Sequence, residues 1–289
     1  MGLELHDFFI KYPTENKLIG DDYLFIEYKC PLESEKAKMW TDTPFLVYVV
    51  SGKKDWTSVD KTHTIEAGEA LFFKRGLYST KQYFDEAYCT VVFFITEDFI
   101  RKFMITNEMM FKSKNNVPSE TYIYDIAVTD SLKALFLSVF SYLKLGSKIP
   151  RDLVEMKFNE LFFNLVMNPV NKDLLTYFDS LKRIEKVNIE TIMKKNFYFD
   201  LKLEEFARLC GRSLSTFKRD FQDYFKETPG KWLNSKRLEY ARTLLENPEL
   251  NINDICYESG FKNISHFNSS FKNRFKYPPN KYRKLILKH

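Results

Sequence analysis

The stretch that decides the fold spans residues 252–283 and reads INDICYESGFKNISHFNSSFKNRFKYPPNKYR. Ile252, Ile255 and Cys256 follow the i, i+3, i+4 spacing of one apolar helical face. Gly260 comes next, and glycine enters the left-handed conformation at a helix C-terminus without the steric cost that other residues meet. The spacing therefore predicts a short helix that ends in a tight turn at this glycine.

A second helix is predicted to begin after Asn263, whose side chain can accept hydrogen bonds from the first backbone N–H groups. Phe267, Phe271 and Phe275 follow at i, i+4 and i+8, so they form one aromatic stripe that we expect to be buried. The opposite face carries small polar residues, Ser265, His266, Asn268 and Ser269. A helix with an aromatic inner face and a short polar outer face suits the major groove of DNA.

The same pattern occurs fifty residues upstream, where Phe217, Phe221 and Phe225 repeat the aromatic stripe. The match continues in register through four further pairs, namely Lys226 with Lys276, Pro229 with Pro279, Lys231 with Lys281, and Trp232 with Tyr282. The upstream copy also has a cap at Ser213 and an outer face of its own, Ser215, Thr216, Lys218 and Arg219. A repeat of this kind predicts a tandem pair of helix-turn-helix units.

Between the two units, a helix is predicted to begin at Thr228, which can cap it, with Pro229 in the first helical position. Asn247 and Pro248 stop this helix. About 19 residues span roughly 28 Å in a helix. That length can hold two recognition helices near one turn of DNA apart, roughly 34 Å.

Residues from about 183 to 287 resemble the DNA-binding domain of AraC-family transcription regulators. The resemblance is carried by Arg237-Leu238, Ala241, Leu244-Leu245, Ile252, Ile255, Gly260-Phe261, Phe267, Phe271-Lys272, Pro279 and Tyr282-Arg283. The chain departs from the family at Lys226 and Lys276, where the family usually has Gly, and at Ser269, where it often has Arg.

The resemblance implies a cytoplasmic transcription regulator, expected to be an activator, that binds double-stranded promoter DNA and contacts RNA polymerase. The polar outer faces of both units are expected to face bases, and Arg219 is the best candidate for a base contact because guanidinium binds guanine through two hydrogen bonds. The alternative for Arg219 is a phosphate contact. Phosphates are expected to be held by Arg237, Lys262, Lys272 and Arg274.

The charge is divided between the two halves of the chain. Residues 180–289 hold 23 Lys/Arg and 13 Asp/Glu, a net charge of +10, whereas residues 1–179 hold 21 and 26, a net charge of −5. A basic C-terminal region on an acidic body is expected of a protein that binds the DNA backbone.

The N-terminal half is predicted to contain strands in residues 21–30, 45–52, 62–76 and 89–95, separated by glycine turns. Such strands indicate an antiparallel barrel, and the segments VVSG and IEAGEALFFKRG resemble the cupin-type barrel of many AraC-family proteins. The predicted fold class is α+β, with a cupin-like barrel and covering helices followed by an all-α tandem helix-turn-helix domain. The expected boundaries are 1–170 for the sensor or dimerisation domain, 171–182 for the linker and 183–289 for the DNA-binding domain.

Enzymatic activity, a catalytic residue, a metal and a cofactor are not expected. A metal site needs several converging ligands, and the barrel region offers the single histidine His63. The four cysteines have no metal-binding spacing and are expected to be reduced packing residues, Cys30, Cys89, Cys210 and Cys256. No apolar run is long enough to span a membrane, and no secretion signal is indicated. A barrel enzyme tethered to DNA and an architectural DNA binder are the other classes that remain.

Two helices are predicted at 131–146 and 151–167. They either cover the open barrel or form a homodimer or partner interface, for which Leu161, Phe162 and Leu165 are the candidates. The segments GEALFFKRGLYS (68–79), MKFNELFFNLVM (156–167) and ARLCGRSLSTFKRDF (207–221) also resemble, in order, segments of the AraC-family activators of type III secretion genes, a subgroup in which the N-terminal domain is thought to bind a protein.

The barrel strands offer many bulky residues that would fill the interior, Phe45, Val47, Val49, Leu71, Phe73, Val91 and Phe93. We therefore expect control by a protein partner or by self-association. The alternative is a small-molecule effector inside the barrel.

Overall fold

The computed structural model describes residues 3–14, 16–20, 22–29, 36–59, 61–83, 87–110, 121–145, 149–182 and 188–287. The chain divides into two compact units, one formed by residues 3–185 and one that contains residues 186–289. Cys30 and Gly146, which were expected to be a packing residue and a helix end, lie outside the described residues.

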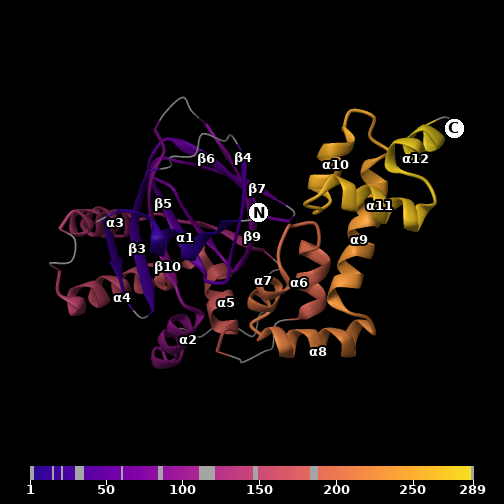
Figure 1. Ribbon diagram of the computed structural model, residues 1–289. Coiled ribbons are helices and arrows are strands. Elements are labelled where there is room, and N and C mark those ends of the chain that lie inside the picture. The colour runs from indigo at the N-terminus through magenta and orange to yellow at the C-terminus, as the bar shows by residue number, and fades with distance from the viewer. Residues whose placement is uncertain are drawn as a thin grey trace. The chain divides into compact units, whose positions relative to one another are not determined.

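The first unit is built on two β-sheets (Figure 1). One has the order β1 (Leu3–Glu4), β4 (Lys36–Thr41), β9 (Gly76–Gln82), β6 (Lys53–Thr57), β7 (Thr62–Glu66). The other has the order β11 (Ile123–Ile126), β8 (Ala70–Phe73), β5 (Phe45–Ser51), β10 (Cys89–Ile95), β3 (Tyr23–Lys29), β2 (Lys17–Ile19). The strands pair antiparallel except β1 with β4. The predicted antiparallel β-domain is confirmed.

The six-stranded sheet is buried on both faces, which explains its nearly continuous apolar strands. Along β5, Phe45, Val47 and Val49 belong to a cluster with side chains of the opposite sheet, such as Trp56 and Tyr78. Leu46 and Tyr48, which alternate with them, belong instead to a second cluster shared with the helices.

Two of the residues expected inside the barrel lie on the other face of the sheet. In the antiparallel pairing of β10 with β5, Val91 is opposite Tyr48 and Phe93 is opposite Leu46, so these side chains point toward the helices. Val92 and Phe94 occupy the interior in their place. The sequence could not distinguish the two faces because every residue of β10 is buried.

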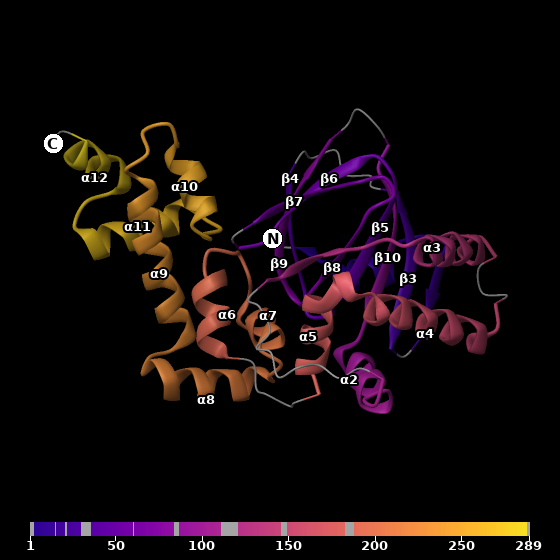
Figure 2. The same cartoon turned by 180° about the vertical axis from the view of Figure 1, so that it is seen from behind.

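The described part of the first unit also contains the helical segments α1 (Leu5–Lys11), α2 (Glu97–Thr106), α3 (Asp130–Leu143), α4 (Arg151–Met167), the 3₁₀ turn η2 (Pro169–Asn171) and α5 (Lys172–Ser180). Helix α2 is capped by Thr96, whose Oγ1 accepts a hydrogen bond from the Phe99 N–H at 3.1 Å. Figures 1 and 2 show α3 and α4 beside the six-stranded sheet, with which their buried side chains share one core cluster.

The residues expected to form a dimer or partner surface are core residues of the first unit. Leu161, Phe162 and Leu165 are each 0% exposed and pack in the cluster between the sheet and its helices. The prediction of a surface contact through these three side chains is therefore wrong. Their spacing identified an apolar helical face correctly, but that face covers the sheet.

The segment expected to be a linker is part of the first unit. Residues 171–182 contain α5, whose Leu174, Tyr177 and Phe178 are buried. The Phe178 ring lies 5.2 Å from that of Phe72 on β8, centroid to centroid. The i, i+3, i+4 spacing of the three residues was a signal for a packed helix. The boundary between the units falls after this helix.

The barrel interior is almost completely filled. It contains a cavity of ≈ 30 Å³ between the two sheets and the N-terminal helix, with room for a few water molecules at most. Its wall is largely apolar, although the buried Lys54 ammonium lies on it, 4.4 Å from the centroid of the Tyr88 ring.

The remaining candidates for chemistry are packing residues. His63 is 6% exposed, and its Nδ1 lies 3.2 Å from Asp125 Oδ1. Cys89, Cys210 and Cys256 are buried thiols. Within the described ranges, no group of three or more potential ligands could hold a metal ion. Of the helices described, none has both the length and the apolar character to cross a membrane.

The second unit consists of α6 (Ile189–Asn196), α7 (Leu203–Leu209), α8 (Leu214–Phe225), α9 (Pro229–Leu244), α10 (Ile252–Glu258), α11 (Ile264–Phe275) and α12 (Pro279–Ile286). Figure 1 shows α9 connecting the pair α7–α8 to the pair α10–α11. The predicted tandem helix-turn-helix arrangement, and with it the α+β fold class, is confirmed.

Buried and exposed residues on α4 lead to different predictions for the stability of the first unit. Leu161→Ala should destabilise the first unit by about 2–5 kcal/mol, because it leaves a cavity in a fully buried cluster. Met156→Ala on the same helix should have little effect, since Met156 is 67% exposed. Thermal unfolding of the two full-length variants measures the difference. Equal losses from both would contradict the packing described here.

Candidate DNA-binding surface

The first recognition helix, α8, is positioned by its cap and its aromatic inner face. Ser213 Oγ accepts a hydrogen bond from the Thr216 N–H at 3.3 Å, which satisfies one of the free donors of the first turn. Phe217 and Phe221 are 0% exposed. The Phe221 ring meets Trp232 of the following helix edge to face, at a centroid distance of 5.9 Å.

The second recognition helix, α11, repeats this construction. Asn263 Oδ1 accepts hydrogen bonds from the N–H groups of Ser265, at 2.8 Å, and His266, at 3.1 Å. The Phe271 ring meets Tyr282 of α12 edge to face at 5.5 Å. Equivalent ring pairs hold the inner faces of α8 and α11, so the outer face of each helix is turned away from the core.

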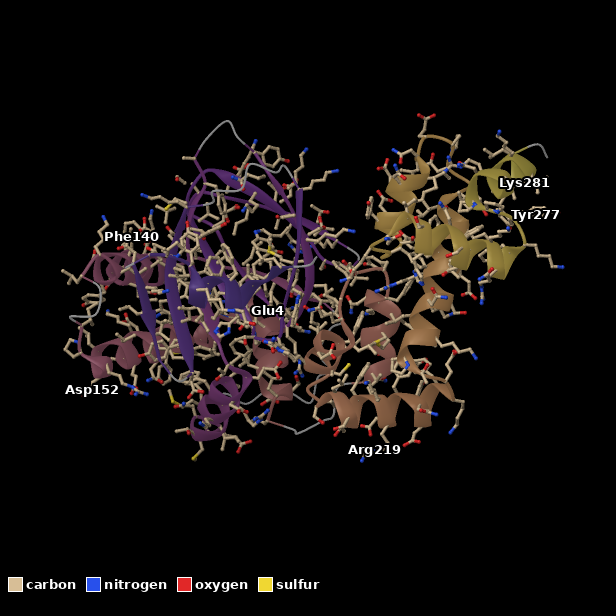
Figure 3. All side chains as sticks on the ribbon, viewed as in Figure 1. Glu4, Phe140, Asp152, Arg219, Tyr277 and Lys281 are labelled. Atoms are coloured by element: carbon tan, nitrogen blue, oxygen red, sulfur yellow. The ribbon has the colours of Figure 1, made fainter. Side chains whose placement is uncertain are left out.

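The outer faces lie where the sequence predicted them. Six of the eight candidate base-facing residues are exposed, Ser215, Lys218, Arg219, Ser265, His266 and Ser269, and two are half-buried, Thr216 and Asn268. Figure 3 shows Arg219 projecting outward from α8. The two sets lie on different helices, so each can meet a different segment of DNA.

Arg219 is an exposed cation on α8 with a weak internal ion pair. Its side chain is 70% exposed, and its Nη2 is 3.3 Å from Asp220 Oδ1. Arg212 makes the shorter contact to the same carboxylate, Nε to Oδ2 at 3.0 Å. The Arg212 hydrogen bond, followed by that from Arg219, lowers the pKa of the Asp220 carboxyl against the effect of desolvation. Arg219 can therefore leave this carboxylate while Arg212 keeps it paired.

The hydroxyl of Ser269 on α11 is engaged within its own helix. Its Oγ lies 3.0 Å from the Ser265 carbonyl oxygen and 3.1 Å from that of His266, so the proton is directed at the preceding turn. The His266 ring lies 5.8 Å from the Phe261 ring, centroid to centroid. In this conformation the Ser269 oxygen can accept a hydrogen bond from DNA, but the hydroxyl proton is already donated to the helix backbone.

Two of the predicted phosphate residues have partners within the unit. Arg274 Nη2 is 2.6 Å from Glu239 Oε1, and its Nη1 donates to Ser235 Oγ at 2.8 Å, which joins α11 to α9. Lys262 Nζ is 3.0 Å from Asp200 Oδ1. Lys272 is exposed and has no ion pair in the part of the chain that is described.

Arg237 has a structural role that the sequence did not reveal. The half-buried side chain donates from Nε to the carbonyl oxygen of Phe197 and from Nη2 to that of Phe199, both at 2.7 Å. These bonds fix the segment between α6 and α7 to α9. The geometry favours this role over the predicted phosphate contact, because two of the guanidinium nitrogens are already directed inward.

Gly260 belongs to the same junction. Its φ of +88° confirms the predicted left-handed turn after α10. A Cβ atom at this position would lie 2.8 Å from the Tyr198 carbonyl oxygen and 2.9 Å from Arg237 Nε. The turn between α10 and α11 therefore packs directly against the segment between α6 and α7. The sequence showed the turn, but the close approach involves residues too distant along the chain to be paired from a single sequence.

The connecting helix differs in detail from the expectation. Thr228 occupies the cap position of α9 but makes no side-chain capping hydrogen bond. Pro229 takes the first helical position, as predicted. Helix α9 has 16 residues and is therefore about 24 Å long, slightly shorter than expected.

Two recognition helices on one rigid connecting helix, joined to a filled β-domain, define a two-domain DNA-binding transcription regulator. Residues 44–177 match the ExsA N-terminal regulatory domain family, and residues 206–285 match a helix-turn-helix domain family. The chain belongs to the AraC family of transcription regulators.

Curated relatives share this organisation over most of the chain. The virulence regulon transcriptional activator VirF of Yersinia enterocolitica is 26% identical over 245 residues, covering 82% of this chain and 88% of VirF. The regulator ExsA of Pseudomonas aeruginosa is 27% identical over 241 residues, covering 82% and 85%. The resemblance to activators of type III secretion genes is thereby confirmed. A solved structure of ToxT from Vibrio cholerae is 15% identical with a TM-score of 0.40, covering 91% of this chain and 98% of that one.

The junction at Gly260 can be tested with a pair of glycines. Gly260→Ala should destabilise the second unit by at least about 1–2 kcal/mol, because alanine is strained in the left-handed region and its Cβ would overlap Tyr198. Gly230→Ala should stabilise by up to about 1 kcal/mol, since Gly230 lies in α9 with nothing within 4 Å of a Cβ. Thermal unfolding of the full chain distinguishes the two. A neutral Gly260→Ala variant would show that the contact is dispensable.

Proposed function

We propose that this chain is a sequence-specific transcription activator that acts in the cytoplasm, reads two adjacent major-groove segments with α8 and α11, and contacts RNA polymerase. The observation that carries the proposal is the pair of recognition helices with equivalent aromatic inner faces and exposed polar outer faces. The net charge of +10 on residues 180–289 supports attraction to the phosphate backbone. Activation is supported by relatives that are named transcriptional activators, such as VirF.

The two helices would read DNA by different chemistry. Helix α8 presents the cations Lys218 and Arg219, and a guanidinium can make two hydrogen bonds to guanine. Helix α11 presents hydroxyl, imidazole and amide groups, of which Asn268 has the geometry that recognises adenine. The α8 half-site would then be fixed chiefly by one strong contact, and the α11 half-site by several weaker ones.

We further propose that the first unit is controlled by a protein partner or by self-association. The cavity of ≈ 30 Å³ is much smaller than the pockets of roughly 300 Å³ or more that hold metabolites. Large apolar side chains are exposed instead on α3 and α4, namely Leu137, Met156 and Met167. A small effector remains the second candidate, favoured by the buried Lys54, whose ammonium could hold an anionic group at the cavity wall.

The assigned roles of Arg219 and Lys272 predict different losses. Arg219→Ala should weaken binding by about 1–3 kcal/mol at one preferred base pair and relax specificity there. Lys272→Ala should weaken binding to all sequences alike and reduce the salt slope by about one unit. Titrations of the full chain with promoter DNA and single-base variants, at several salt concentrations, measure both. Sequence-independent losses from both changes would refute the base contact.

Because both recognition helices lie in the C-terminal part of the chain, we predict that a fragment of residues 180–289 binds promoter DNA in the absence of the β-sheets. The affinity should fall steeply with salt, because several phosphates are neutralised. An electrophoretic shift assay at low and moderate salt measures this. Absence of any shift at low salt would contradict the proposed function.

If the first unit is controlled through the exposed side chains of α3 and α4, Leu137→Asp or Met156→Asp should lower self-association or partner binding. Both side chains are more than half exposed, so the fold should be retained. Analytical ultracentrifugation and partner capture measure the effect, with unchanged DNA binding by residues 180–289 as the control. A stoichiometric small molecule recovered from the barrel, whose removal shifts operator affinity, would favour the effector instead.

A further inference from the structure

Two lysines have the least favourable backbone conformations in the described part of the chain. Lys226 has a φ of 59° and Lys276 a φ of 68°, and within the described ranges they are the non-glycine residues with positive φ. Each immediately follows a recognition helix, at equivalent positions of the repeat. Glycine is preferred at such positions because its lack of a Cβ removes the steric conflict.

Nothing within the unit explains why lysine should occupy these sites. Both residues are exposed, and neither side chain has a hydrogen bond or an ion pair in the part of the chain described. Lysine also lacks the short polar side chain with which asparagine stabilises the left-handed conformation locally. A side chain larger than glycine at a position that strains its backbone, with no partner for that side chain within the described part of the unit, points to a ligand outside the unit.

The two lysines continue the outer stripes of their helices. Lys276 follows Ser265 by eleven residues and Lys272 by four, and Lys226 follows Ser215 by eleven residues and Arg219 by seven. Eleven residues are close to three full helical turns, so the ends of both stripes fall on the DNA-facing side. Both backbones repeat nearly the same left-handed conformation at this point.

The length of the helices carries these ends to the groove edge. Helices α8 and α11 each have 12 residues, so each is about 18 Å long. The major groove is only about 12 Å wide. A helix that crosses the groove obliquely, with its first turn at the base edges, can therefore place its last residue near the phosphates that border the groove.

We propose that Lys226 and Lys276 are a matched pair of contacts to the DNA backbone, one at the end of each recognition helix. The ligand is a phosphate of duplex DNA, held by a single ammonium at each site. This inference rests on the proposed function, since it requires α8 and α11 to lie in the groove. Lysine in place of glycine then has a function at both positions. Each lysine has a less favourable backbone conformation but adds one positive charge.

The test is that the glycine variants should lose affinity for DNA without losing stability. In full-length Lys226→Gly and Lys276→Gly, the thermal midpoint should rise or stay constant, because glycine removes the conformational strain. The logarithmic salt slope of binding to a promoter fragment selected by the wild-type protein should fall by about 0.9 for each lysine and about 1.8 for the double variant. Affinity should decrease for all sequences alike, since phosphates carry no sequence information.

Four matched variants make the result unambiguous. Lys226→Arg and Lys276→Arg should retain the wild-type salt slope, because the charge remains. Lys226→Asn, which tolerates the left-handed conformation, should behave as the glycine variant. Lys194→Gln removes an exposed lysine that pairs with Glu190, and should leave the slope unchanged.

Wild-type affinity and slope in the glycine variants would overturn the inference while leaving DNA binding intact. Failure of the wild-type protein to bind any promoter fragment would overturn the proposed function itself. An equal decrease of the slope in Lys194→Gln would show a general charge effect and would also overturn the assignment of these two lysines.

Discussion

The second unit depends on one buried arrangement, in which Arg237 of α9 donates to the carbonyl oxygens of Phe197 and Phe199. The turn at Gly260 lies against Tyr198, between those two acceptors in the sequence, and leaves no space for a side chain. The chain segment that follows α6 is thus held by the connecting helix and by the turn of the second recognition pair. Both contacts are short, and they hold the connecting helix and the turn before α11 against the same segment.

The aromatic inner faces of α8 and α11 show why much of this unit could be predicted from the sequence. Phe217 and Phe221, like Phe267 and Phe271, repeat at helical spacing and are buried as that spacing requires. The caps Ser213 and Asn263 are local signals too, since each acts within three residues. The role of Arg237 could not be found in this way, because its acceptors lie 40 and 38 residues away. The exposed outer faces were predicted, but the internal partners of Arg274 and Lys262 were not.

The first unit was harder to predict from the sequence because its strands and helices are apolar on more than one side. In β10 every residue is buried, so no polar alternation indicated that Val91 and Phe93 face the helices. In α4 the apolar stripe with Leu161 was visible, but a stripe of this kind suits a partner's surface as well as the protein's own sheet. Whether it is covered from within depends on β3 and α3, which no local pattern brings to it.

The burial of the central strands of the six-stranded sheet has a consequence for the chain before it folds. The segments FLVYVVS of β5 and CTVVFFI of β10 are seven residues long and contain neither charge nor proline. Such segments can stack between molecules into cross-β assemblies when they are exposed. In the folded sheet β5 lies between β8 and β10, and β10 between β5 and β3, so neither offers a free edge. During synthesis β5 leaves the ribosome about 40 residues before β10, and through that interval its hydrogen-bonding edge is open to other nascent chains.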